Sequence, residues 1–501
     1  MEYAIAVIDI GMTNKKVAVY DDLLNQLDAR YLVFDPVIVD GMECHDLEAM
    51  EEWFLTEIKS LAEKYPIKVI SISTHGATFV CTGKNGKPAV PCVYYTHEPG
   101  DEFHKRFYET FGKKEELQAK TGTPAFKAMI NPAKGLFFAQ EKFAESFKNV
   151  TSVLPYPQYW GFRLTGKAGV ESTYMGNHTY LWNHSEGCLS SVAQKLGIAD
   201  KLPDKLCKPW DILGTIKCEL AEKTGLPKET IVTMGIHDSN SALLPHFAKK
   251  GERGFILNST GTWCVIMNPV EKYGFAPDEL GKVVFFNISA FGNPIKTAIF
   301  LGGLEFETWS ELIQKQHRRN DNPPWNEELY RRILKEKKIF LLPELTQGSG
   351  QFPSSRARIS DNGKNYYFDD LELAADKGFA DYETSIAVLR ISLVMQTLTA
   401  LERAGIQKGY DVYTEGGFRK DESYSRLLSS ALSENKAFLT DIKEASALGA
   451  AIIAKMAVSG DTGKSLESLS EDFKISYNEQ EKGSFPELEP YRKAWLSEAE
   501  K

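Results

Sequence analysis

The sequence contains no uninterrupted run of about 18 apolar residues, the length that a membrane-spanning helix needs. A pattern typical of a β-strand begins within four residues of the N-terminus, and no basic leader precedes it. Both observations argue against a membrane segment or an export signal. We therefore expect a cytoplasmic protein without a membrane partner.

The sequence also lacks cysteine pairs with metal-ligand spacing and an excess of positive charge. None of the seven cysteines forms a C-x-x-C pair, which argues against a zinc site or a disulfide framework. Lys and Arg number 59 against 68 Asp and Glu, giving a net charge of −9. Because no basic excess is available to neutralise phosphates, we expect no nucleic-acid partner. Neither a Walker A motif nor G-x-G-x-x-G occurs, which argues against a P-loop or Rossmann site.

The length of 501 residues exceeds one typical core and predicts two domains of an α/β protein. A strand, turn and strand pattern at 4–22 returns at 254–268, after a Lys-Lys-Gly sequence, which suggests two related halves. We predict an N-terminal domain over 1–248, a C-terminal domain over 249–460 and a surface tail over 461–501.

The first of these hairpins, AIAVIDIGMTNKKVAVYDD, places a carboxylate at the end of an apolar strand and a donor-rich turn behind it. Asp9 would serve a magnesium ion directly or through water, because hard oxygen ligands suit this metal. Backbone N–H groups and small polar side chains of the turn would line a phosphate. The candidate phosphate-binding residues are Gly11, Thr13, Asn14 and Lys15. Alone, the pattern is also typical of a plain β-hairpin.

Two further turns would complete such a site. Gly261 and Thr262 lie in the Ser/Thr-rich turn of the second hairpin and would hold phosphates from the opposite domain. Gly416 and Gly417 follow a short strand, and the absence of side chains there allows a flat ligand such as adenine to approach closely. Each turn alone could equally be structural.

Asp238 is the candidate catalytic group. It follows the apolar strand TIVTMGI and precedes a helix, so its carboxylate lies at the sheet edge where ligands of open α/β sheets bind. As a general base it would take the proton of a substrate hydroxyl during in-line phosphoryl transfer. Its alternative role is that of an N-cap for the helix.

The order of these motifs resembles the FGGY carbohydrate kinases of the actin-like ATPase superfamily. DIGMTNKK, THGATFV, LPYPQYWGFRLTG, GIHDSNSAL, NSTGTW, EGGFRKDESYSRLLSSAL and ASALGAAIIA occur in the family's order from about residue 4 to 457. The resemblance implies two ribonuclease-H-like domains flanking a deep catalytic cleft, Mg²⁺ and ATP in that cleft, and a sugar phosphorylated on a hydroxyl. By motif, Asp9 matches the family's metal-associated aspartate, and Asp238 matches its catalytic base. Gly11 and Thr13 match the first phosphate loop, Gly261 and Thr262 the second, and Gly416 and Gly417 the adenosine loop. We also predict Asp238 as a second ligand of the metal.

The same resemblance suggests a sugar site. His75 and Gly76 match the His-Gly that contacts ketoses in the xylulokinase branch, although they could also form a turn with a capping histidine. Where the family often has Trp-x-Asp-x-Arg, this chain has Tyr95-Thr96-His97-Glu98-Pro99, so that Tyr95, His97 or Glu98 would substitute. The predicted sugar-binding residues are His75, Gly76, Tyr95, Trp160 and Asp238.

The sequence GTW at residues 261–263, together with HDS at 237–239, resembles the rhamnulokinase and fuculokinase branch. We therefore predict ATP-dependent phosphorylation of a 6-deoxyketohexulose such as L-rhamnulose or L-fuculose, or of a pentulose such as xylulose or ribulose. A homodimer is possible because similar kinases form dimers. The alternatives are a regulatory relative that binds ATP and sugar without catalysis, and an actin-like chaperone ATPase.

Overall fold

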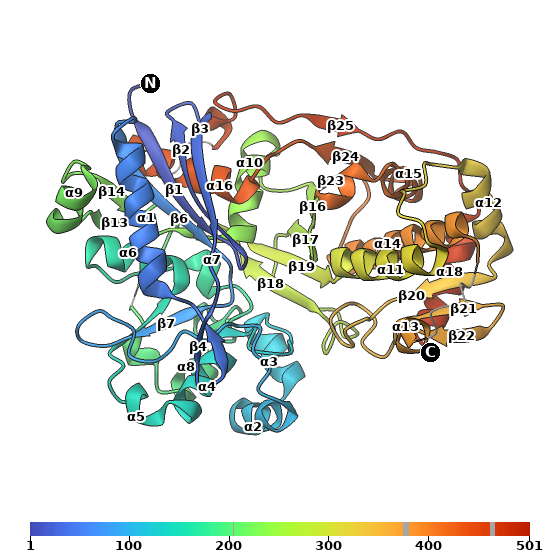
Figure 1. Ribbon diagram of the computed structural model, residues 1–501, viewed down its shortest axis with the longest axis horizontal. Coiled ribbons are helices and arrows are strands. Elements are labelled where there is room, and N and C mark those ends of the chain that lie inside the picture. Colours follow the sequence, from blue (N-terminus) through green and yellow to red (C-terminus); the bar gives the residue numbers. More distant parts are fainter. Residues whose placement is uncertain (204, 374–379, 461–465) are drawn as a thin grey trace.

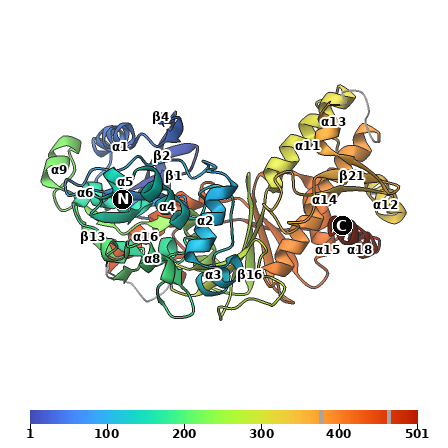
Figure 2. The same ribbon diagram turned by 90° about the horizontal axis from the view of Figure 1, so that it is seen from below.

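The computed structural model describes residues 1–203, 205–373, 380–460 and 466–501. It has two lobes, each built around a seven-stranded sheet. The first half of the sequence forms most of the lobe at the left of Figure 1, and the second half forms the lobe at the right. Figure 2 shows the same two lobes from below, joined through a narrower middle.

Strand β1 (Ala4–Ile10) lies inside the first sheet and is buried at every position except Asp9, which is only partly buried. It pairs antiparallel with β2 (Asn14–Asp21) and parallel with β6 (Ile67–Thr74). The sheet order is β13 (Ile212–Thr215), β14 (Ile231–Thr233), β6, β1, β2 and β3 (Gln26–Val33), with β15 (Ile236–His237) also paired to β6. Strands buried on both faces read as continuous apolar runs, which explains the sequence of β1.

The second sheet repeats this arrangement around β16 (Phe255–Thr260), which pairs antiparallel with β17 (Cys264–Pro269) and parallel with β23 (Asp411–Gly416). Its order is β18 (Val284–Ile288), β19 (Pro294–Phe300), β17, β16, β23, β24 (Lys436–Thr440) and β25 (Tyr477–Glu479). The predicted α/β fold with two related domains is confirmed.

Helices cover both sheets. Those of the first lobe include α1 (Leu47–Ala62), α2 (Asp101–Phe111), α3 (Lys114–Thr121), α4 (Pro132–Lys142), α6 (Tyr156–Thr165) and α9 (Cys218–Thr224). Those of the second include α11 (Gly302–His317), α12 (Glu327–Glu336), α14 (Tyr382–Arg403), α15 (Glu422–Ala431) and α18 (Leu488–Ala499).

Two helices join the lobes: α10 (Asp238–Lys250) and α16 (Ala445–Ser459). Helix α16 comes late in the sequence, yet it packs on β1 and β6 of the first sheet as well as on α10. A Cβ atom on Gly449 of α16 would lie 1.9 Å from the carbonyl oxygen of Ser241 on α10, so the two helices meet backbone to backbone. The predicted boundary between 248 and 249 lies in the last turn of α10.

The C-terminal segment is more than the predicted surface tail. Strand β25 extends the second sheet, and α18 buries Tyr491 and Trp495 completely in the core of the second lobe. The indole N–H of Trp495 donates to the carbonyl oxygen of Leu341 at 2.8 Å. Strand β25 and helix α18 therefore pack on the second lobe, whereas α17 (Leu466–Leu469) packs against α10.

Helix α14 is the one described helix that is long and apolar enough to cross a membrane by length and composition. Its apolar window is fully buried inside the protein, where it packs against α11, α15, β19 and β20 (Ile339–Leu342). The apolar composition of α14 is thus explained by core packing.

Candidate active site

The two predicted phosphate turns occupy equivalent places in the two sheets, between β1 and β2 and between β16 and β17. A backbone hydrogen bond closes each turn: Gly11 N to Asn14 O in the first and Gly261 N to Trp263 O in the second, both 3.0 Å. Thr13 and Thr262 are exposed. Both turns therefore leave hydroxyl and N–H donors open to a ligand.

The third turn lies directly beside the second, because β23 pairs with β16 and places Gly416 opposite Thr260. Gly416 has a φ of +85°, and a Cβ there would lie 2.0 Å from the carbonyl oxygen of Thr260. The Thr260 hydroxyl donates to the Glu415 carbonyl and accepts from the Phe418 N–H at 3.0 Å. The backbone at position 416 thus has no space for a side chain. At Gly417 there is more room, because a Cβ there would lie 3.7 Å from its nearest neighbour.

Lys15 and Lys16 face opposite sides of β2, because neighbouring residues on a strand alternate. Lys16 Nζ lies 3.2 Å from Asp9 Oδ2. Lys15 is buried, and its ammonium donates to the carbonyl oxygens of Met12 at 2.6 Å and Thr13 at 3.3 Å. Burial lowers the pKa of Lys15 to about 8. The structure thus places Lys15 inside the turn, bound to its backbone, and Lys16 beside the strand-end carboxylate.

Asp238 is the first residue of α10 and follows β15. Its Oδ1 accepts the Ser239 N–H at 2.6 Å and the Ser239 hydroxyl at 3.2 Å, and it lies 3.2 Å from His237 Nε2. Burial and then the nearby charge of Asp9 raise the pKa of Asp238 to about 7. The exposed third of the side chain faces a cavity between the lobes. The protein therefore surrounds a carboxylate whose proton affinity suits acid–base chemistry near neutral pH.

That cavity has a volume of about 180 Å³. Both domains contribute to its lining, which includes His75, Gly76, Tyr95, Phe126, Asn177, His178, His237, Asp238, Trp263, Phe285, Asn287 and Ile299. Among the described residues of the lining, Asp238 is the one carboxylate, and no Lys or Arg is present. The cavity is suited to an uncharged ligand next to a single acidic group.

Four of the five predicted sugar-binding residues, His75, Gly76, Tyr95 and Asp238, line this cavity together. Gly76 has no room for a side chain, because a Cβ would lie 2.0 Å from Asn177 Nδ2. Of the three candidates at positions 95–99, Tyr95 is the one in the lining; Glu98 instead accepts the Gly100 and Ala128 N–H groups and organises its own loop.

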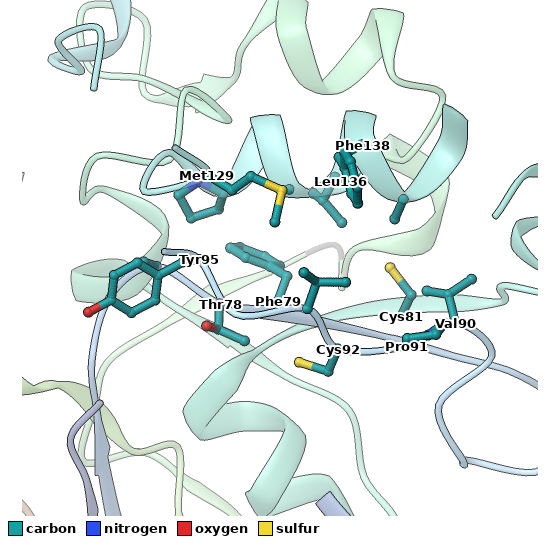
Figure 3. Close-up of a pocket in the computed structure, with 15 residues that line it drawn as sticks. Thr78, Phe79, Cys81, Val90, Pro91, Cys92, Tyr95, Met129, Leu136 and Phe138 are labelled. Carbon is teal, nitrogen blue, oxygen red and sulfur yellow. The ribbon is translucent and has the colours of Figure 1, made fainter. Parts of the chain in front are cut away.

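Tyr95 also borders a second hollow, shown in Figure 3, which Phe79 lines beside it and Met129 and Leu136 line from the opposite side. This hollow measures about 40 Å³. The cavity that contains Asp238 is larger than this hollow and includes the candidate catalytic carboxylate, so it is the candidate substrate site.

The fifth residue, Trp160, does not line the cavity. It is 2 % exposed and packs in the core of the first lobe, with its ring centroid 5.0 Å from that of Phe54 and 5.1 Å from that of Tyr159. Helix α6 turns this side chain towards α1 rather than towards the cleft. The prediction that Trp160 binds sugar is wrong.

Replacing Trp160 with phenylalanine should therefore lower stability without changing substrate binding. We expect a loss of about 1–3 kcal/mol in the free energy of unfolding, since a smaller ring leaves unfilled space in a packed core. Urea denaturation checks the first part and the sugar KM checks the second. A KM raised more than about threefold in the folded variant would place Trp160 back at the site.

Several buried polar atoms of the cavity have no hydrogen-bond partner in the described structure. They are His75 Nδ1 and Nε2, Asn177 Oδ1, His178 Nδ1 and Asn287 Oδ1. Unpartnered buried polar atoms are costly, so native proteins usually satisfy them with water or a ligand. Sequence reasoning missed Asn177, His178 and Asn287, because each stands in a segment without a recognisable motif.

The histidines around Asp238 are neutral at physiological pH. Burial lowers the pKa of His237 to about 3 and that of His178 to about 4, and it holds the pKa of His75 well below its ordinary value. Each neutral imidazole offers one N–H donor and one acceptor. The unpartnered imidazoles of His75 and His178, together with the Asn177 and Asn287 amide groups, can therefore recognise hydroxyl groups, whereas both nitrogens of His237 already have amide partners.

The donor set near the turns fits Mg²⁺. Asp9 and Asp238 present carboxylate oxygens close enough that the charge of Asp9 raises the pKa of Asp238. No cluster of three or more His, Cys, Asp or Glu side chains with metal-binding geometry occurs in the described part of the chain. Mg²⁺ is commonly held by one or two carboxylates together with substrate phosphates, so this sparse set suits it better than it suits zinc or calcium.

Comparison with known protein families decides the classification. The model of the N-terminal domain of FGGY carbohydrate kinases matches residues 4–245, and the model of the FGGY C-terminal domain matches residues 252–462. The chain belongs to the FGGY family of carbohydrate kinases. The family resemblance expected from the motif order is confirmed.

The curated FGGY relatives carry names that agree with the predicted branch. A rhamnulokinase from Halalkalibacterium halodurans is 26% identical over 270 residues, which cover 53% of this chain and 56% of that protein. An L-fuculokinase from Salmonella typhi is 24% identical over 270 residues, with 52% and 56% covered. The matched region thus spans about half the length of these relatives.

Solved structures of carbohydrate kinases share the fold over nearly the whole chain. A carbohydrate kinase from Novosphingobium aromaticivorans superposes with a TM-score of 0.79 at 24% identity, covering 99% of this chain and 98% of its own. A ligand-bound xylulose kinase from Lactobacillus acidophilus gives a TM-score of 0.79 at 17% identity, with 99% and 97% covered. The two-lobed architecture is that of the family.

Proposed function

We propose that this protein transfers the γ-phosphoryl group of ATP to a hydroxyl group of a neutral ketose in the cytoplasm, with Asp238 as the general base. The observation that carries the proposal is the position of Asp238. Its carboxylate lines the interdomain cavity and lies close enough to Asp9, next to the first phosphate turn, for the Asp9 charge to raise its pKa. A hydroxyl held in the cavity would thus lie between a base and a phosphate donor.

Both lobes contribute residues to the reaction. The turns at 11–14 and 261–262 hold the phosphates of ATP from the two lobes, and the turn at 416–417 accommodates its adenosine. Asp238 takes the proton of the attacking hydroxyl, and Asp9 and Asp238 would hold Mg²⁺. Bound Mg²⁺ neutralises charge on the phosphates. Exclusion of water from the phosphoryl group once both substrates fill the cavity would favour sugar over water as acceptor.

The lining favours a 6-deoxyketohexulose, such as L-rhamnulose or L-fuculose, as the substrate. Phe126, Phe285 and Ile299 form an apolar wall to which both domains contribute. Such a wall suits a terminal methyl group, while the unpartnered imidazole and amide groups suit hydroxyls. The names of the rhamnulokinase and L-fuculokinase relatives support the same choice, and pentuloses such as xylulose and ribulose are the second candidates.

The rate should depend on pH through Asp238. A general base acts only when ionised, and the pKa of this carboxyl is raised to about 7. We therefore expect kcat/KM to rise about tenfold per pH unit below this pKa and to level off above it. A profile from pH 5 to 9 in constant ionic strength checks this. A rate that is already flat from pH 5 upwards would contradict the assignment.

A sugar panel tests the proposed function. ADP formation from Mg-ATP should require a sugar and should be fastest with L-rhamnulose or L-fuculose, slower with D-xylulose, L-ribulose or D-ribulose, and slowest with glycerol. Gluconate serves as a charged control, because the cavity lining offers no cation for its carboxylate. ATP binding without any sugar-dependent ADP formation would favour a regulatory protein instead.

A further inference from the structure

Two groups contact the strand-end carboxylate of Asp9: one lies far away in the sequence, and the other lies on the next strand. The Ser446 hydroxyl, at the start of α16, donates to Asp9 Oδ2 at 2.8 Å. Lys16 Nζ lies 3.2 Å from the same oxygen. Both contacts fall on Oδ2, so Asp9 is oriented from one side only.

Lys16 is shared with a second carboxylate. Its ammonium lies 3.1 Å from Glu444 Oε2, nearly the same distance as from Asp9, and the lysine side chain is 7 % exposed. Tyr31, on strand β3, donates its hydroxyl to the other oxygen of Glu444 at 2.5 Å. A single buried cation thus lies between two anions, and the cluster of Asp9, Lys16 and Glu444 has a net charge of −1.

Glu444 adopts a backbone conformation that is unusual for its residue type. Its φ is +56° and its ψ +53°, in the left-handed region, just before α16 begins. A residue other than glycine in this region is strained unless its surroundings hold it. The contacts with Tyr31 and Lys16 supply that restraint, and together they hold the Glu444 carboxylate beside Lys16, two residues past the first phosphate turn.

The same segment is tied to the helix that bears Asp238. The Ser241 hydroxyl on α10 donates to the carbonyl oxygen of Ser446 at 2.6 Å. The close approach of Gly449 to Ser241 keeps the two helices in backbone contact. The start of α16 therefore has a defined position relative to both candidate catalytic carboxylates.

A carboxylate near a phosphate site repels the phosphates and weakens nucleotide binding, so its presence there calls for a role. We propose that Glu444 is a positioning residue that holds Lys16 in the absence of nucleotide and competes with the nucleotide phosphates for this lysine. This inference rests on the proposed function, because it assumes that the turn at 11–14 binds phosphates. When a phosphate is present, Lys16 turns to it, and Glu444 remains bound to Tyr31. After phosphoryl transfer, Lys16 pairs with Glu444 again and loses its contact with the phosphates, which favours release of ADP.

The experiment is titration of ADP by calorimetry in buffer that contains a chelator, so that no metal takes part. Glu444→Gln keeps the shape of the side chain and removes its charge. We expect it to lower the Kd for ADP about three- to tenfold, the size of a partly screened charge effect. Lys16→Met should weaken binding, and adding Glu444→Gln to Lys16→Met should bring no gain, because the competition no longer exists.

Glu489→Gln is the matched control. It removes a carboxylate of the same domain that is exposed and paired to Lys493 at 3.6 Å, so it tests the effect of net charge alone. Its Kd for ADP should equal that of the wild type. A Glu444→Gln variant that binds ADP no more tightly than the wild type, or a gain that persists without Lys16, would overturn the proposal.

A structure of the wild-type protein with ADP gives an independent reading that needs no variant. Lys16 Nζ should then contact a phosphate oxygen and lie beyond about 4 Å, the limit of an ion pair, from Glu444. An unchanged contact with Glu444 and no contact with phosphate would also overturn the proposal. If the wild type binds ADP but phosphorylates no sugar, the proposed function fails, whereas the ADP titrations still decide the role of Glu444.

Discussion

Replacing Asp238 with asparagine is expected to lower kcat for the best ketose by about 10² to 10⁴, the usual contribution of a general base. Asparagine has the same shape, and its amide oxygen can still accept the Ser239 N–H, so the Kd for the sugar should stay within about threefold. Steady-state kinetics and calorimetry measure the two effects separately. A kcat within about threefold of the wild type would show that another group is the base.

A control separates catalysis from stabilisation of the helix start; the N-cap role expected as an alternative for Asp238 is wrong, because His237 is the N-cap and Asp238 the first residue of α10. Asp381 is the N-cap of α14, where its carboxylate accepts the Thr384 N–H at 2.9 Å. Asp381→Asn should cost about 1 kcal/mol of stability or less and leave kcat unchanged. If both variants lost activity alike, destabilisation of a helix start rather than loss of a base would explain the result.

The same Asp238 variant should gain stability at alkaline pH. The pKa of this carboxyl in the folded protein, about 7, lies above its ordinary value of 3.8. The unfolded chain therefore releases the proton first, and the folded state loses relative stability as pH rises from about 4 to 7. Asp238→Asn should raise Tm at pH 8 and have little effect at pH 4. The opposite order would mean that Asp238 is stabilised as an anion.

Replacing Gly416 with alanine is expected to damage the nucleotide turn more than any other single-methyl change there. The new Cβ would lie 2.0 Å from the Thr260 carbonyl oxygen, and the φ of +85° is strained for any residue with a side chain. Either the turn moves or the β16 to β23 pairing opens. We expect the KM for ATP to rise at least about tenfold and Tm to fall by several degrees.

Gly417 provides the matched comparison for this change. Its φ is not positive, and a Cβ there would have its nearest neighbour at 3.7 Å, an ordinary contact. Gly417→Ala should leave Tm within about 2 °C of the wild type. Equal loss of stability in both variants would contradict the geometry of the turn and point to a general intolerance of this loop.

The sequence predicted the central strands and the three turns well because local chemistry determines them. A buried strand rarely tolerates a carboxylate, so Asp9 within an apolar run, with glycine and threonine directly after it, indicates a ligand site. The position of Asp238 at the sheet edge could be predicted for the same reason, since it lies between a strand and the start of a helix. The repeated hairpin at 254–268 likewise indicated a second, related sheet.

Long-range contacts determine what the sequence could not predict. Trp160 stands in a recognisable motif, but the direction of its ring depends on how α6 packs against α1. Asn177 and Asn287 carry no motif, and they meet at one cavity only because the two lobes come together. The role of Lys16 rather than Lys15 beside Asp9 depends on which face of β2 each lysine occupies.

The last segment of the chain gives a similar lesson. Its charged composition predicted a surface tail, whereas Tyr491 and Trp495 complete the core of the second lobe. Two aromatic residues one helical turn apart were the available signal, because residues at this spacing lie on the same face of a helix. Their burial also depends on strand β20, whose carbonyl groups accept hydrogen bonds from both side chains.

The central claim is that this chain transfers a phosphoryl group from ATP to a ketose hydroxyl, with Asp238 as the general base. Mass spectrometry of the sugar after incubation with Mg-ATP tests it most directly. The account predicts that L-rhamnulose or L-fuculose gains one phosphoryl group with the wild type, in step with ADP formation, and gains at least about a hundredfold less per unit time with Asp238→Asn. Accumulation of ADP with every sugar of the panel left unmodified would contradict it and indicate an ATPase that does not phosphorylate sugar.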